Sequence, residues 1–198
     1  MAKQLNWLVV DKKLRAEGLT LFTPHDVANL LGASEVSVRF LLTRAVKRGD
    51  AHKFRRGLYT LATASPSELV VANALYRPSY LSFAFALSYH RLIPESVYAI
   101  TSATPRTTAT FTALGRQFIY HHIKPTAFSG YRAERLHNNV VWVAEPEKAL
   151  VDTLYFVWLG KQALPERLNT GGLSKSKVRA FAKLFGRPEL LATVENIL

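Results

Sequence analysis

The stretch from residue 23 to residue 49 carries two helix patterns separated by one short turn, and this spacing restricts the folds open to the chain. Thr23-Pro24 predicts a helix start, because threonine caps free amide groups and proline fits the first helical turn. That helix ends at Gly32, and Ser34 is placed to cap a second helix that ends at Gly49. Two helices joined by a short glycine-containing turn make a helix-turn-helix.

The residues on either side of these helices extend the pattern. Residues 3–17 predict a further helix, and residues 19–22 predict a short strand before the pair. After the pair, residues 51–54 and 58–61 predict two strands around a turn at Gly57. Helix, strand, helix, turn, helix and hairpin follow one another in a winged helix-turn-helix, in which the hairpin is the wing.

The rest of the chain predicts a second domain of mixed composition. Ser65-Pro66-Ser67-Glu68 has the pattern of a capping box, with Ser65 as the N-cap. We therefore expect an α+β protein with a winged helix-turn-helix over 1–64 and a mixed α/β domain over 65–198. The predicted helices of this second domain are a helix through residue 75, 83–92, 146–159 and two within 174–198, and its predicted strands are 97–101, 109–113, 116–123 and 140–143.

The net charge of +12, with a pI near 10.1, indicates an anionic partner, and nucleic acid is the most common one. Residues 1–62 carry 11 Lys/Arg and 5 Asp/Glu, and residues 63–198 carry 15 and 9, so both parts have a net charge of +6. The densest later run is Lys175, Lys177, Arg179 and Lys183. It is either a second phosphate contact or an ordinary solvated helix face.

The second helix of the pair predicts a basic outward face. At 100° per residue, an apolar stripe from Val38 to Val46 lies on one side, and Glu35 is the one acid of the helix. Phe40 points outward, where it either covers a thymine methyl group or packs on a neighbouring element; we favour packing. Arg39 is placed to bind guanine O6 and N7. The predicted DNA-contacting residues are Ser34, Ser37, Arg39, Thr43, Arg44, Lys47 and Arg48 on the helix, and Lys53, Arg55 and Arg56 on the wing.

No sequence motif indicates catalysis, and we expect no enzymatic activity, cofactor or metal site. Cysteine is absent, which excludes thiolate zinc sites, and the six histidines lack the spacing of a metal motif. Phosphate-binding loops, nucleophile elbows and the paired carboxylates of a metal-dependent nuclease are also missing. The sequence has no apolar run of about 18 residues and no signal peptide, so we expect a cytoplasmic protein without membrane contact.

Several stretches resemble the AbiEi family of antitoxins from type IV toxin–antitoxin systems. The resemblance covers roughly residues 20–160, and one departure is Arg91, where the family usually has glycine. It implies a repressor that binds inverted repeats in its own promoter, with a C-terminal domain that counters a nucleotidyltransferase-like toxin without a stable complex. The matching stretches are Arg55-Arg56-Gly57-Leu58-Tyr59, Pro78-Ser79-Tyr80-Leu81-Ser82, Ala86-Leu87-Ser88-Tyr89-His90, Leu92-Ile93-Pro94-Glu95 and Pro146-Glu147-Lys148-Ala149-Leu150-Val151-Asp152.

The residues alone leave two other hypotheses about function open. One is a stand-alone winged-helix regulator whose second domain senses a ligand or dimerises, and the other is an RNA-binding or RNA-modifying protein. Lys148 and Asp152, four residues apart on a predicted helix, are expected on an exposed stripe. They are either part of the antitoxin surface or a plain surface ion pair.

Overall fold

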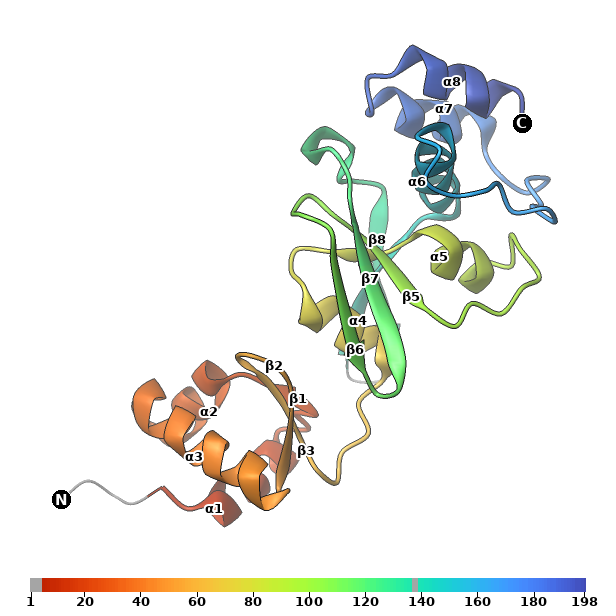
Figure 1. Ribbon diagram of the computed structural model, residues 1–198. Coiled ribbons are helices and arrows are strands. Elements are labelled where there is room, and N and C mark those ends of the chain that lie inside the picture. The colour runs from red at the N-terminus through yellow and green to blue at the C-terminus, as the bar shows by residue number, and fades with distance from the viewer. Residues whose placement is uncertain (1–4, 137–138) are drawn as a thin grey trace. The chain divides into compact units, whose positions relative to one another are not determined.

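The computed structural model describes residues 5–136 and 139–198, and it has the mixed α+β composition that the sequence predicts (Figure 1). The chain forms two compact units, Met1–Leu75 (unit 1) and Tyr76–Leu198 (unit 2). The sequence predicted a boundary between residues 64 and 65, which is earlier in the chain than the division between Leu75 and Tyr76. Residues 3 and 4 of the first predicted helix lie outside the described residues.

Unit 1 combines helices with a small antiparallel sheet. Its elements are α1 (Trp7–Ala16), β1 (Leu21–Phe22), α2 (Pro24–Leu31), α3 (Glu35–Arg48), β2 (Ala51–Arg55), β3 (Leu58–Leu61) and α4 (Glu68–Leu75). The strand order is β1-β3-β2, so β3 lies in the middle and pairs with both neighbours. Apolar residues from the first three helices and the sheet, among them Leu14, Val27 and Leu42, form one buried core.

The helix ends of unit 1 follow from local chemistry. Thr23 and Asp26 form a capping box, in which the Thr23 amide donates to Asp26 Oδ2 at 2.7 Å and the Asp26 amide donates to Thr23 Oγ1 at 3.2 Å. Ser34 caps α3 by accepting from the Ser37 amide at 3.3 Å. Gly32 ends α2 with a φ of 61°, a left-handed conformation that glycine adopts without a steric penalty. The predicted limits of α2 and α3 are confirmed.

The prediction that Ser65 caps the next helix is wrong. α4 begins only at Glu68, and the hydroxyl nearest its start is Ser67 Oγ, which accepts from the Leu69 amide at 3.4 Å. The two serines are two residues apart, and the sequence pattern cannot say which of them ends the preceding loop.

Unit 2 is built on a mixed sheet with strand order β6-β7-β5-β4-β9-β8. Its strands are β4 (Tyr80–Leu81), β5 (Ile100–Thr104), β6 (Ala109–Ala113), β7 (Arg116–His122), β8 (Tyr131–Leu136) and β9 (Asn139–Ala144). The pairs β5–β7 and β4–β9 are parallel, and the other neighbours are antiparallel. β4 and β8 were not predicted, and β5 begins three residues later than expected.

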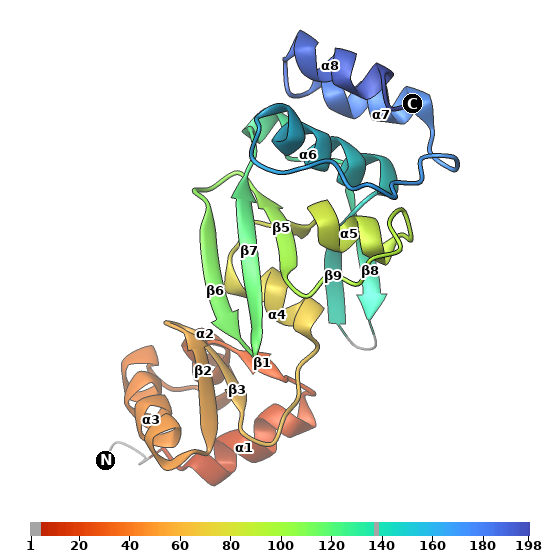
Figure 2. The ribbon, with the colours of Figure 1, turned by 45° about the vertical axis from the view of Figure 1, so that its right-hand side comes forward.

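The helices of unit 2 are α5 (Phe83–Tyr89), the short η1 (Pro125–Ala127), α6 (Pro146–Trp158), α7 (Lys175–Lys183) and α8 (Pro188–Glu195). α5 packs against α6, and α7 and α8 pack against each other and on the side of α6 away from the sheet (Figure 2). The core of unit 2 therefore closes around α6, which is buried over most of its length.

Candidate nucleic-acid interface

The exposed face of α3 carries the residues that the sequence places outward. Val38, Leu41, Leu42 and Ala45 are at most 2% exposed and form the inner stripe. All predicted DNA-contacting residues of unit 1 are exposed: Ser34, Ser37, Arg39, Thr43, Arg44, Lys47 and Arg48 on α3 or its cap, Lys53 and Arg55 on β2, and Arg56 in the turn after β2. Gly57 lies in the turn of the β2–β3 hairpin. Its φ of 82° is in the left-handed region, which glycine adopts without a steric penalty.

The cations of this surface fall into two groups. Arg39 is paired with Glu35 at 3.1 Å, and Arg48 is paired with Asp50 at 2.8 Å. Arg55 is also engaged, because its guanidinium donates to the Arg56 carbonyl at 2.9 Å and more weakly to a carbonyl of α4 at 3.4 Å.

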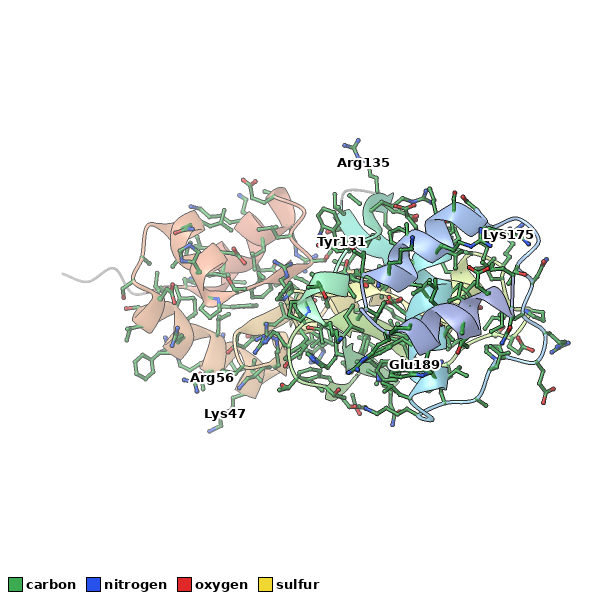
Figure 3. All side chains as sticks on the ribbon, turned by 90° about the horizontal axis from the view of Figure 1, so that it is seen from above. Lys47, Arg56, Tyr131, Arg135, Lys175 and Glu189 are labelled. Atoms are coloured by element: carbon green, nitrogen blue, oxygen red, sulfur yellow. The ribbon has the colours of Figure 1, made fainter. Side chains whose placement is uncertain are left out.

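The second group has no counter-ion among the residues that the structure describes. Arg44, Lys47, Lys53 and Arg56 are exposed and form no ion pair with any residue in the described ranges 5–136 and 139–198. In the view of Figure 3, the side chains of Lys47 and Arg56 extend from the same edge of unit 1. We call these four side chains the open cations; they are available to an external anion without breaking an existing pair.

The one acid of α3 is held at the start of the helix. Glu35 Oε1 lies 3.0 Å from His25 Nδ1, and Glu35 Oε2 accepts from Arg39. These two hydrogen bonds, that from His25 first, lower the pKa of Glu35 below its usual range. Glu35 therefore stays ionised at neutral pH and is paired with Arg39.

The hydroxyl groups of α3 have local partners. Ser34 Oγ donates to Ser37 Oγ at 3.0 Å while it caps the helix, and Thr43 Oγ1 donates to the Arg39 carbonyl at 2.8 Å. Each hydroxyl oxygen keeps acceptor capacity that an external donor can use.

The interpretation that Phe40 packs on a neighbouring element is wrong. Its side chain is 68% exposed, and Val36, one turn earlier on the same face, is 65% exposed. Helical spacing predicted the outward direction correctly. The expectation of a neighbour failed because no described element of unit 1 covers this face of α3.

The expectation that Lys148 and Asp152 form an exposed pair is also wrong. Both side chains are 0% exposed, and Lys148 Nζ donates to Asp152 Oδ1 inside the core of unit 2. Asp152 Oδ2 also accepts from Tyr80 OH at 2.9 Å and from Ser82 Oγ at 2.7 Å. Spacing of i and i+4 puts two side chains on one face of a helix, but it does not say whether that face is exposed.

Burial governs the chemistry of this cluster, which we call the buried network (Lys148, Asp152, Tyr80 and Ser82). Removal from water lowers the pKa of Lys148, an effect that the carboxylate partly offsets. Burial, followed by the nearby Asp152 carboxylate, raises the pKa of Tyr80 well above its usual value. Lys148 Nζ also lies 4.7 Å from the centre of the Phe185 ring. Nothing in this arrangement is accessible to a partner's surface.

Sequence reasoning missed Tyr80 and Ser82 as members of the buried network. Both belong to a stretch quoted for the family resemblance, and Lys148 and Asp152 belong to another. The two stretches lie about 70 residues apart in sequence and meet through Asp152. Because both stretches were quoted for the same family resemblance, that resemblance was the one sequence signal that could have linked them.

Two of the four cations in the basic run of α7 form ion pairs within unit 2. Lys177 is paired with Glu145 at 2.8 Å, and Arg179 binds both carboxylate oxygens of Glu195 at 2.6 and 2.7 Å. Lys175 donates to the Leu198 carbonyl. These contacts favour a solvated helix face over a second phosphate contact.

Among the described residues, no group of three His, Cys, Asp or Glu side chains comes close enough to hold a metal ion. No helix within the described ranges combines the length and apolarity needed to cross a bilayer. Neither a scan against protein-family models nor a search of curated proteins found a match to this chain.

Proposed function

We propose that unit 1 is a winged helix-turn-helix domain that binds duplex DNA, and that the protein is a transcriptional repressor. The observation that carries the proposal is the set of open cations on α3 and the β2–β3 hairpin. These cations are exposed, and Glu35, the one acid of α3, is already paired. A helix of this kind enters the major groove with its N-terminal half nearest the bases, while the wing contacts phosphates or the minor groove.

The order of elements supports the same proposal. α2 and α3 are joined by a short turn at Gly32, and the β2–β3 hairpin follows α3 directly in the chain. In the sheet, β3 lies between β1 and β2. A groove-binding helix followed by a basic hairpin gives two contacts with one duplex. Arg39 would add base recognition once Glu35 releases it, because its guanidinium can then bind guanine O6 and N7.

The test is the salt dependence of binding to a duplex from the region upstream of the protein's own gene. Each phosphate neutralised contributes about −0.9 to the slope of log K against log salt, so the open cations alone give a slope of about −3.6. Fluorescence anisotropy between low and moderate salt measures it. An affinity independent of salt would contradict DNA binding, and tighter binding to a structured RNA of equal length would favour the RNA-binding alternative.

The role of antitoxin is a second part of the proposal and is supported by the family resemblance. A full-length Lys47→Ala/Arg56→Ala variant separates the two roles, because both side chains are exposed on unit 1. We expect it to lose repression and to protect cells from a nucleotidyltransferase-like toxin as well as the parent chain. Loss of protection together with repression would contradict a separate antitoxin role for unit 2. A stand-alone regulator would lack a toxin gene beside its own.

A further inference from the structure

Two exposed apolar side chains lie on the outward face of α3, in the N-terminal half of the helix. Phe40 is 68% exposed and Val36 is 65% exposed. They are four residues apart, so they lie one above the other on the same side of the helix. Arg44 and Lys47, two of the open cations, follow on the same face within the next two turns. This face is therefore apolar in the N-terminal half of α3 and cationic in its C-terminal half.

Apolar and cationic side chains on one helix face limit the kinds of partner surface that can bind to it. An apolar partner alone would leave Arg44 and Lys47 without counter-ions, and a purely anionic partner would leave the phenyl ring in water. The major groove of DNA supplies both features, because phosphates line its edges and the C5 methyl groups of thymine project from its floor. Phe40 is among the side chains that can make apolar contact with such a methyl group.

We infer that Val36 and Phe40 form a reader for thymine methyl groups in the major groove. The inference rests on the proposed DNA binding of unit 1 and adds the base that this surface selects. Four residues of helix rise about 6 Å, and two base-pair steps rise about 6.8 Å. The two side chains therefore match thymines about two steps apart when α3 lies along the groove.

Replacing thymine by uracil tests the inference, because it removes the methyl group and keeps every hydrogen-bonding group of the base pair. A duplex selected with the full-length chain is remade with uracil at one thymine at a time. We expect an affinity loss of about fourfold at one or two positions, the value for one buried methyl-sized group. Positions outside the contact should show no change.

Measuring the variant Phe40→Ala on the same thymine and uracil duplexes completes a double-mutant cycle. Because the side chain is mostly exposed, we expect an unchanged melting temperature, and the difference between thymine and uracil duplexes should disappear. Leu8→Ala is the matched control, since Leu8 is 74% exposed on α1 of the same unit. It should keep the full difference between the two duplexes.

The outcomes separate the inference from the function on which it rests. Salt-dependent DNA binding with equal affinity for thymine and uracil duplexes would overturn the methyl reader and leave the proposed function standing. A thymine preference that Phe40→Ala retains would also overturn it. If no duplex binds with salt dependence, the proposed function itself fails.

Discussion

Removing the buried cation of unit 2 tests how the buried network acts. In the variant Lys148→Met, the side chain keeps a similar length and a similar helix propensity. The Asp152 carboxylate then remains inside the core with only the hydroxyl donors of Tyr80 and Ser82. An ionised carboxylate without a counter-ion is costly in a medium of low dielectric constant.

The expected loss is about 3–5 kcal/mol of unfolding free energy, the usual cost of breaking a buried ion pair from one side. Domains of this size are stable by about 5–15 kcal/mol, so the loss is a large fraction of the total. It corresponds to a fall in melting temperature of about 10–20 °C for unit 2. The double variant Lys148→Met/Asp152→Asn should recover part of the loss, because the amide oxygen still accepts from both hydroxyls and no charge is buried.

Urea unfolding measures these differences. In a Trp7→Phe background the remaining tryptophans, Trp142 and Trp158, both lie in unit 2, so their fluorescence reports on that unit. Lys177→Met is the matched control, because it breaks an exposed pair in the same unit and should leave the midpoint almost unchanged. The reasoning is refuted if Lys148→Met is as mild as this control, or if the double variant is less stable than Lys148→Met alone.

Two further predictions concern unit 1. Glu35→Gln should raise DNA affinity by about two- to fivefold, since it removes a negative charge from α3 and releases Arg39; an unchanged or lower affinity in anisotropy titrations would contradict this. Arg56→Ala should reduce the magnitude of the salt slope by about 0.9. Arg55→Ala should reduce it less, because the Arg55 guanidinium is engaged with carbonyl groups; equal reductions for the two variants would argue against that distinction.

The sequence predicted unit 1 well because its signals are local. The Thr23 cap, Gly32 and Ser34 each act within one turn of their own position, and the structure places the ends of α2 and α3 there. The direction of the α3 face follows from helical periodicity in the same way. Helical periodicity cannot say whether another element covers that face. Whether Phe40 has a neighbour depends on how parts of the chain far from it in sequence fold.

Unit 2 was predicted less completely, for the same physical reason. β4 has only two residues and takes its conformation from pairing with β5 and β9, which lie elsewhere in the sequence. β8 does not alternate strictly, because the charged residues Glu134 and Arg135 are adjacent, and its conformation is likewise fixed by pairing with β9. Strands of this kind carry little signal of their own, because their stabilisation comes from cross-strand contacts.

The buried network changes what the family resemblance can say about function. The stretches around Tyr80 and Lys148 resemble an antitoxin family, yet the structure uses them to join β4, the start of α5, and α6 inside the core. A motif of this kind carries information about the fold of unit 2, and proteins that share it need not share a partner. A loss of protection in a Lys148 variant would therefore be explained first by unfolding. A surface that acts on a toxin has to be sought among exposed residues of unit 2, with stability measured for every variant.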